Sequence, residues 1–262
     1  MEKVCMLVSL ISLYGIIDLR PLTMSIQVDI YYIHMPDTSV HIASTLAGIN
    51  ALHKKGRFNR FGLSNFSAEQ VQEVYDHAKE KGYVLPTVYQ GNYNPLARHY
   101  EVLLFPTLRK LGISFYAYSP LAGGFLAKNR KQIEEGVGRL NGDTFVGKMY
   151  RMLYAKPELI DILGEWSEKA KAEGATGAEM AYRWVRYNSI LSPEHGDALI
   201  FGSKSVDEAA QTLEWLSKGP VSESAARYID DVWKRIEHVA PLDNISVMKD
   251  LNKAQQQEKS EK

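Results

Sequence analysis

Residues 28–34 read VDIYYIH, a short and mostly apolar run that ends abruptly in a histidine. Four further runs have the same form, with polar residues at their ends, at positions 60–65, 87–90, 114–119 and 198–203. The first four begin roughly thirty residues apart, which is the length of one strand followed by one helix. The pattern predicts repeated βα units. In an α/β barrel the polar groups at such strand ends form the active site.

Segments with helical signals separate these strands. Ser67 is a suitable N-cap for a helix that would stop near Gly82, and a second helix is expected from Leu96 to Leu111. The stretch 121–156 lacks a sustained apolar period, so we expect a long loop of the kind that often carries function. Further helices are expected over residues 157–174, 177–187, 205–217 and 221–239.

Composition narrows the classes of function. Lys and Arg together number 31, as do Asp and Glu, so nothing indicates a surface for nucleic acid or anionic membranes. The single cysteine, Cys5, excludes an internal disulfide and fits a reducing compartment, and no metal site is expected. The apolar residues 4–17 are too short for a membrane span, and no cleavage pattern follows them. We therefore expect a cytoplasmic location.

Four motifs occur in a characteristic order: YYIHMPD at 31–37, GLSNF at 62–66, YQGNYN at 89–94 and YAYSPLAGG at 116–124. Together with GSKS at 202–205, they resemble the aldo-keto reductase superfamily, and most closely its aflatoxin-aldehyde reductase branch. The resemblance implies an α/β fold of the (β/α)8 TIM barrel type. It also implies an NADPH-dependent oxidoreductase that reduces aldehydes or ketones to alcohols by hydride transfer. The partner is then a small-molecule carbonyl compound, and the formation of a homo-oligomer stays open.

The resemblance assigns roles to individual residues. His34 would contact the carbonyl oxygen of the substrate, and Tyr118 would stack beneath the nicotinamide ring. Glycine-rich backbone lets a pyrophosphate approach closely, and a helix start offers an anion site for the 2′-phosphate. The expected cofactor-binding residues are Ser64, Asn65, Gln90, Tyr118, Ser119, Pro120, Leu121, Gly123, Gly124, Gly202, Ser203, Lys204, Ser205, Glu208, Gln211 and Thr212. The expected substrate residues are Arg139, Tyr150 and Arg151.

The beginning of the chain departs from the family pattern. The family's proton donor is a tyrosine assisted by a lysine and an aspartate, on strands ahead of the histidine strand; Tyr14 and Lys3 lie in no such motif. We therefore expect an incomplete barrel that lacks about three βα units. The expected boundaries are an atypical segment over 1–27, the partial barrel over 28–242, and a tail over 243–262 that is disordered at its end. Loss of the acid would cost a factor of roughly 10² to 10⁴ in rate.

Several hypotheses stay open. The chain is an aldo-keto reductase in shortened form, a remnant that binds NADPH or a partner without reductase activity, or a sequence whose upstream part is missing. A phosphate-binding barrel of sugar metabolism is a further alternative, against which Gln90 and the Ser64-Asn65 pair argue. An acidic Glu208 would repel a 2′-phosphate and Lys204 would offset this, so NADPH is expected over NADH. Motifs do not determine which carbonyl compound is reduced.

Overall fold

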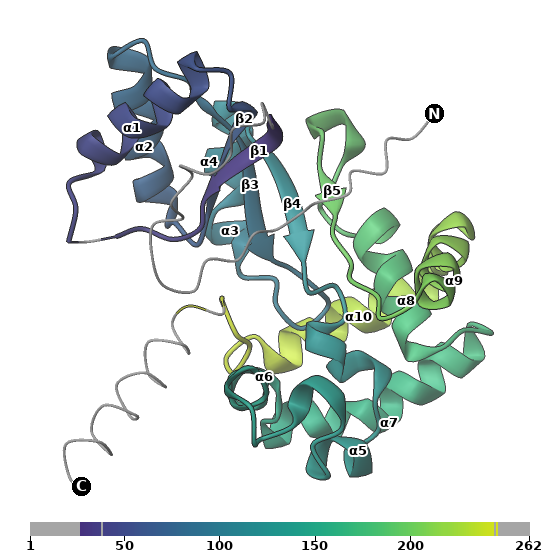
Figure 1. Cartoon of the computed structure of the whole chain (residues 1–262). Helices are drawn as coiled ribbons and strands as arrows, with labels where there is room; N and C mark the ends of the chain where they lie inside the picture. Colours follow the sequence, from purple (N-terminus) through teal and green to yellow (C-terminus); the bar gives the residue numbers. More distant parts are fainter. Residues whose placement is uncertain (1–26, 38, 244, 246–262) are drawn as a thin grey trace, which may run out of the picture.

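The computed structural model describes residues 27–37, 39–243 and 245. Their centre is a parallel sheet with the strand order β1-β2-β3-β4-β5 (Figure 1). The strands are β1 (Val28–Ile33), β2 (Phe58–Ser64), β3 (Pro86–Asn92), β4 (Ser114–Tyr118) and β5 (Ala198–Leu199). Each crossover adds the next neighbour in chain order, as in an α/β barrel. The predictions for the N-terminal segment and the tail lie outside the described residues, and the domain boundaries stay predictions.

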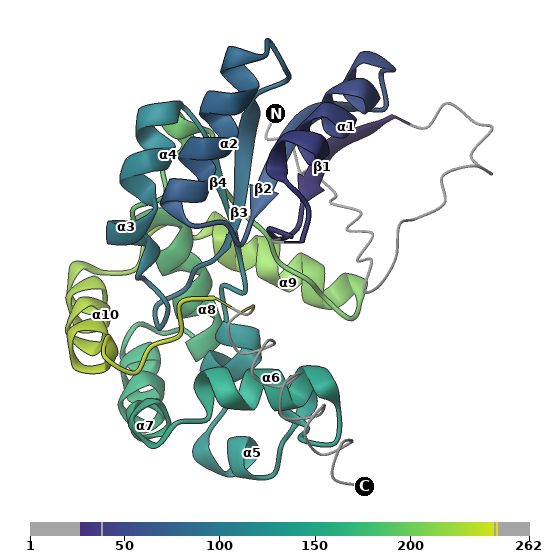
Figure 2. The same cartoon turned by 90° about the vertical axis from the view of Figure 1, so that its left-hand side faces the viewer.

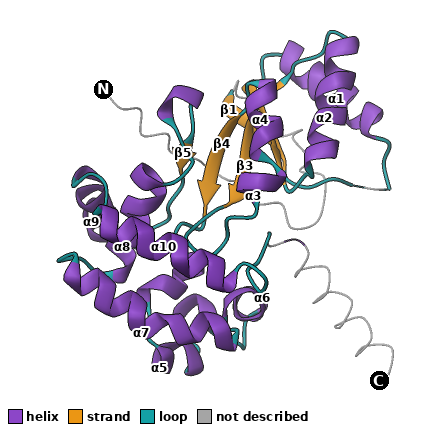
Figure 3. Cartoon of the chain, turned by 180° about the vertical axis from the view of Figure 1, so that it is seen from behind, coloured by secondary structure: helices purple, strands orange, loops and turns teal. Residues whose placement is uncertain are grey.

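Helices connect these strands: α1, α2 and α4 flank the sheet, whereas α5, α6, α7 and α10 lie beyond the C-terminal ends of β3 and β4 (Figures 2 and 3). Four of them precede β4 in the chain: α1 (Ile42–Lys54), α2 (Ala68–Glu80), α3 (Tyr100–Leu103) and α4 (Phe105–Leu111). Four lie between β4 and β5: α5 (Arg130–Glu134), α6 (Phe145–Tyr154), α7 (Pro157–Ala172) and α8 (Gly177–Arg183). The last two described are α9 (Val206–Ser217) and α10 (Glu223–Ile236), and short helical turns occupy Ala122–Ala127, Gly138–Leu140, Trp184–Asn188 and Pro193–His195.

Side chains alternate between the two faces of the sheet, and the two faces differ in chemistry. On one face, Phe61 and Phe115 are fully buried, and the ring centroid of Phe115 lies 4.6 Å from that of Phe105 in α4. On the other face the Arg60 guanidinium lies 2.6 Å from an Asp29 oxygen and 3.1 Å from the Tyr116 hydroxyl, and so connects β1, β2 and β4. The apolar face therefore forms the core beneath the helices, whereas the second face carries polar groups.

One expectation about helices is wrong. The helix expected over 96–111 is instead a turn followed by α3 and α4, which are separated at Leu104, where φ is −130°. Pro106 stands in the first turn of α4, and its missing N–H prevents a continuous helix through this segment. The helix expected over 177–187 is present, as α8 up to Arg183 and then as the wider helical turn Trp184–Asn188. The helices expected over 67–82, 157–174, 205–217 and 221–239 are confirmed as α2, α7, α9 and α10.

The stretch 121–156 is also not the loop that was expected. It contains α5 and α6 and two helical turns. Thr144 begins α6, because its hydroxyl accepts a hydrogen bond of 2.9 Å from the Gly147 N–H. The buried side chains of α6 include Met149 and Leu153, which pack into the core. Elements this short show too few apolar repeats to be recognised from periodicity.

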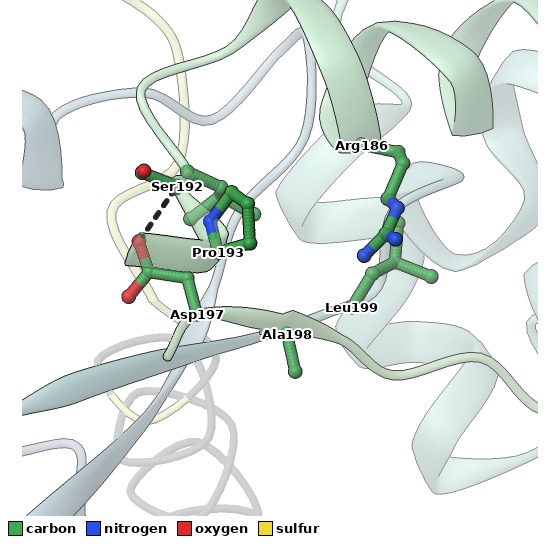
Figure 4. A pocket seen from close by; sticks show the side chains of 7 residues that line it. Arg186, Ser192, Pro193, Asp197, Ala198 and Leu199 are labelled. Carbon is green, nitrogen blue, oxygen red and sulfur yellow. Dashed lines mark hydrogen bonds between the residues drawn. The ribbon is translucent and has the colours of Figure 1, made fainter. Parts of the chain in front are cut away.

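Two small cavities lie near the N-terminal ends of β4 and β5. One, of about 10 Å³, has Asp197, Ser192 and Arg186 among its lining residues and lies at the start of β5 (Figure 4). The other, of about 180 Å³, lies before β4, where Gly112 and Ile113 line it. The smaller has room for about one water molecule. In the described ranges no helix is long and apolar enough to cross a membrane, and no cluster of three metal-ligating side chains occurs.

Candidate active site

Polar side chains from neighbouring strands meet at the C-terminal end of the sheet. Strand pairing sets Ile33 beside Leu63, so His34 follows at the level of Ser64, which is itself paired with Gln90. The Ser64 hydroxyl donates a 2.9 Å hydrogen bond to the carbonyl oxygen of Gln90. Tyr118 is paired with Asn92, two residues beyond Gln90, and therefore lies on the same face of the sheet. The four predicted strand-end residues are thus brought together.

Asn65 connects two of these strand ends. Its backbone is left-handed, with φ at 60°, a conformation that asparagine tolerates better than most residues. The side-chain nitrogen donates to the His34 carbonyl oxygen at 2.8 Å and to the Ser64 hydroxyl at 3.0 Å. The side-chain oxygen Oδ1 is buried and has no hydrogen-bond partner among the described residues. A buried acceptor without a partner costs free energy, so this site favours a ligand that brings an N–H or O–H donor.

His34 and Tyr118 are both uncharged at neutral pH. Partial burial lowers the pKa of His34 below its ordinary value of 6.5, because water no longer fully solvates the charged imidazolium. Burial raises the pKa of Tyr118 well above its ordinary value of 10.0. The neutral imidazole offers one N–H donor and one acceptor nitrogen, and the phenol keeps its proton. Both side chains can therefore bind and orient a ligand without changing charge.

The backbone after β4 adopts an uncommon conformation. Ser119 and Ala122 have φ values of 55° and 52°, in the left-handed region, and they are followed by Gly123 at 68° and Gly124 at 92°. A side chain at Gly123 would collide with the Tyr150 ring, since its Cβ would lie 2.2 Å from a ring carbon. Left-handed residues other than glycine cost about 1 kcal/mol or more each and concentrate at ligand sites. This loop is therefore a candidate cradle for a cofactor.

Three cations gather where the loop after β4 approaches the loop after β5. Lys128 donates from Nζ to the Gly124 carbonyl oxygen at 2.9 Å. Its pKa is lowered by burial and by the charges of Lys204 and Arg139. Arg139 also reaches the second loop, because its Nη2 lies 3.8 Å from where a Cβ of Gly202 would be. Like charges repel one another, and an anion among them would relieve that repulsion. The sequence patterns did not predict Lys128 as a site residue. Its position four residues after Gly124 is the feature of the sequence that could have indicated it.

The predicted phosphate-end residues begin α9. Gly202, Ser203 and Lys204 are exposed, and Ser205 caps the helix by accepting a 3.2 Å hydrogen bond from the Glu208 N–H. A Glu208 side-chain oxygen in turn accepts from the Lys204 N–H at 2.8 Å. Two other predicted residues form contacts within the helix. The Gln211 amide donates to Glu214 at 3.0 Å, and the Thr212 hydroxyl donates to the Glu208 carbonyl oxygen at 2.9 Å.

The three predicted substrate residues lie in different surroundings. Arg139 lies with the cations described above. The Tyr150 hydroxyl is 3.3 Å from the Ser119 hydroxyl, so this side chain contacts the loop after β4. Arg151 donates to the Ile133 carbonyl oxygen at 2.9 Å and thereby holds the segment between α5 and α6. A substrate role for these residues stays a prediction.

Known proteins share sequence with this chain over most of its length. The family model described as "Aldo/keto reductase family" matches residues 20–234. "Oxidoreductase sirO" of Leptosphaeria maculans is 40% identical over 215 residues, which cover 82% of this chain and 65% of that protein. Human "Aldo-keto reductase family 7 member A3" is 37% identical over 225 residues, covering 82% and 67% respectively. Human "Aflatoxin B1 aldehyde reductase member 2" is 36% identical over 225 residues, covering 82% and 62%.

The chain thus spans 65% of the length of the first of these relatives and 62% of that of the aflatoxin aldehyde reductase. The match includes all five strands of the described sheet. The resemblance to the aflatoxin-aldehyde reductase branch is confirmed by these identities. The chain belongs to the aldo/keto reductase family.

Proposed function

We propose that this chain binds NADPH across the C-terminal ends of β2 to β5 and serves the reduction of aldehydes or ketones to alcohols. The observation that carries the proposal is the buried, unpaired Oδ1 of Asn65 beside Ser64 and Gln90. The carboxamide of a nicotinamide carries an NH2 group that would donate to this oxygen. The same carboxamide would find a second acceptor and a donor on the Gln90 side chain.

The three cations support binding of the phosphate groups in the same proposal. Lys128 and Arg139 would meet the diphosphate beside the left-handed loop, and Lys204 would meet the 2′-phosphate at the start of α9. This reassigns Arg139 from a substrate residue to a phosphate contact. Glu208 hydrogen-bonds the backbone of Lys204 and so has part of its charge compensated, which leaves room for a 2′-phosphate. We therefore propose NADPH rather than NADH as the preferred cofactor.

When bound, NADPH supplies a hydride to the carbonyl carbon. His34 would donate its imidazole N–H to the carbonyl oxygen and so fix the orientation of the substrate. Tyr118 would provide a flat apolar surface beneath the nicotinamide ring. Neither residue readily releases a proton at neutral pH, because the first is already neutral and the pKa of the second is raised. The proton for the product alcohol would therefore come from water or from a residue outside the described part of the chain.

We further propose that the five described strands are part of an eight-stranded barrel. The parallel sheet with strands in chain order supports this, as does the share of the relatives' length that the chain spans. If the other strands of the barrel are absent from the protein, we propose a second function, in which the chain binds NADPH but does not reduce carbonyl compounds. This second function fits the finding that neither His34 nor Tyr118 readily releases a proton at neutral pH. The cytoplasmic location and the homo-oligomer stay predictions.

Isothermal titration of the purified chain with NADPH, and separately with NADH, tests the proposal. At a hundredfold excess over the dissociation constant, NADPH should also stabilise the fold by about 2.7 kcal/mol. Oxidation of NADPH is then followed in the presence of an aromatic aldehyde such as 4-nitrobenzaldehyde. Binding with turnover supports the reductase, and binding without turnover supports the second function. A folded chain that binds no NADPH would overturn both.

A further inference from the structure

A buried network of polar side chains lies directly behind the loop that follows β4. Its members are Asn92 at the end of β3, Asn94 two residues later, and Tyr154 at the end of α6. Each of these side chains is at most 1% exposed. None belongs to the residues expected to touch NADPH. Buried polar groups are costly unless all of them are paired, so a network at this position calls for an explanation.

The hydrogen bonds of the network meet at the Tyr154 hydroxyl, and one of them extends to Ser119. The Asn94 amide nitrogen donates to the Ser119 carbonyl oxygen at 3.1 Å and to the Tyr154 hydroxyl at 3.1 Å. The amide oxygen of Asn94 accepts from the Leu96 N–H at 2.9 Å. The Tyr154 hydroxyl donates to Asn92 Oδ1 at 3.3 Å. Both protons and the oxygen of the Asn94 amide are therefore used, and its orientation is fixed from three directions.

Ser119 is one of the two residues other than glycine in this loop that have left-handed backbone. It is the first left-handed residue after β4, with φ at 55°, and a serine gains nothing from that conformation by itself. A second contact comes from Tyr150, whose hydroxyl lies 3.3 Å from the Ser119 hydroxyl. Tyr150 and Tyr154 are one helical turn apart on α6, and their rings stack with centroids 6.4 Å apart. One face of α6 thus contacts the Ser119 side chain directly through Tyr150, and supports the Ser119 backbone indirectly through Tyr154 and Asn94.

We propose that Asn92, Asn94 and Tyr154 are positioning residues that keep the loop 119–124, with its left-handed Ser119, in the conformation that accepts the cofactor's diphosphate. This inference rests on the proposed binding of NADPH. The network joins three segments that are far apart in the chain: the end of β3, the loop after β4, and α6. Pairing across these segments allows one arrangement of the loop, whereas apolar packing at the same place would allow several. The network therefore acts on affinity through the loop and not by contact with the ligand.

The test is the variant Tyr154→Phe, with Tyr93→Phe as its matched control. The Tyr93 side chain is equally buried, and its hydroxyl donates to Glu101 at 2.6 Å. Tyr93 follows β3 directly, and its ring packs against Trp184 and Phe105. Tyr154→Phe loses the hydrogen bonds of its hydroxyl to Asn92 and Asn94, and Tyr93→Phe loses the one to Glu101, so both should melt at a lower temperature than the wild type. We expect Tyr154→Phe to raise the dissociation constant for NADPH about tenfold. The Tyr93→Phe value should equal that of the wild type.

Adenosine 2′-monophosphate separates positioning from general loss of structure. This probe would occupy the start of α9 and leave the loop after β4 empty. Its affinity should therefore be the same in the wild type, in Tyr154→Phe and in Tyr93→Phe. A general loss of structure would instead weaken NADPH and adenosine 2′-monophosphate by the same factor in Tyr154→Phe, and would overturn the proposal.

Tyr150→Phe is the second variant, and it decides the matter if Tyr154→Phe does not fold. It removes only the contact with the Ser119 hydroxyl and should weaken NADPH binding about threefold, again without effect on adenosine 2′-monophosphate. Unchanged NADPH affinity in the folded tyrosine variants of α6 would overturn the positioning role and leave the proposed function intact. Absence of NADPH binding by the wild type would overturn the proposed function, and this inference with it.

Discussion

The side-chain nitrogen of Asn65 lies 2.8 Å from the carbonyl oxygen of His34 and ties the end of β2 to the end of β1. The same nitrogen is 3.0 Å from the Ser64 hydroxyl, so the amide plane is held in one orientation with Oδ1 directed away from both. The residue proposed to orient the substrate and the residue proposed to hold the nicotinamide are therefore linked by a single side chain. A change at Asn65 should affect both.

Asn65→Ala should weaken NADPH binding at least tenfold, because the carboxamide loses its acceptor. The variant should also lower the free energy of unfolding by about 2 kcal/mol, since the His34 carbonyl oxygen loses a donor and alanine is strained at positive φ. Titration calorimetry and urea unfolding measure the two effects. Asn65→Gly is the matched control: it removes the same side chain without the strain. It should bind NADPH as weakly as Asn65→Ala while being more stable, and wild-type affinity in either variant would contradict the assignment.

Lys128→Gln should weaken NADPH binding about tenfold, because one charge-assisted contact to phosphate is lost. The pKa of Lys128 is lowered, so the wild-type amine loses its proton before an ordinary lysine does as the pH rises. Wild-type affinity should therefore fall with rising pH below the ordinary lysine value of 10.5, and this fall should be smaller in Lys128→Gln. Lys131→Gln, an exposed lysine 3.8 Å from Glu135, is the control and should keep the wild-type pH profile. Identical profiles for Lys128→Gln and the wild type would contradict the phosphate role.

His34 should make the fold less stable in acid. Its pKa is lower in the folded protein than the ordinary 6.5 that applies to the unfolded chain, so the unfolded chain binds more protons between the two values. The free energy of unfolding should therefore fall as the pH drops below 6.5 and level off below the folded pKa. Urea unfolding of the wild type and His34→Gln across this range measures the contribution. The variant should show a shallower fall in acid, and equal slopes would show that His34 is not the group responsible.

Asp197→Asn should destabilise the fold by about 3 kcal/mol. The Asp197 carboxylate is 1% exposed and accepts two hydrogen bonds from Arg109, one from the Phe115 N–H at 2.8 Å and one from the Ser192 N–H at 2.9 Å. The amide would leave the Arg109 charge half-buried without its partner. Thermal and urea unfolding measure the loss.

Arg235→Gln provides the control for this ion pair. Arg235 makes the same two-pronged contact to Glu165, but both side chains are about half exposed. Water already screens exposed charges, so the loss should stay below about 1 kcal/mol. If Asp197→Asn and Arg235→Gln lower the free energy of unfolding equally, burial does not make the Asp197–Arg109 ion pair the more stabilising of the two.

Local patterns predicted the strands well because each strand is an apolar run with a polar end, and such runs need no distant information to be recognised. The capping residue Ser67 likewise predicted the start of α2, and the structure shows its capping box with Gln70. Prediction failed for α6 because the helix is too short to show a clear apolar period. It also failed for the segment of α3 and α4, where the single residue Pro106 interrupts the helix. For the site, resemblance supplied the strand-end residues, and periodicity alone would not have done so.

The sequence by itself determined the order of the βα units, because this order depends on the spacing of apolar runs along the chain. Its motifs also determined the family and the strand-end residues, through their resemblance to known proteins. Tertiary structure decided which distant groups meet. It placed Lys128, Arg139 and Lys204 together, left the Asn65 side-chain oxygen without a partner, and joined Tyr154 to Asn94 behind Ser119. These contacts depend on sheet register and on how α6 packs, and both are set by burial of the whole core.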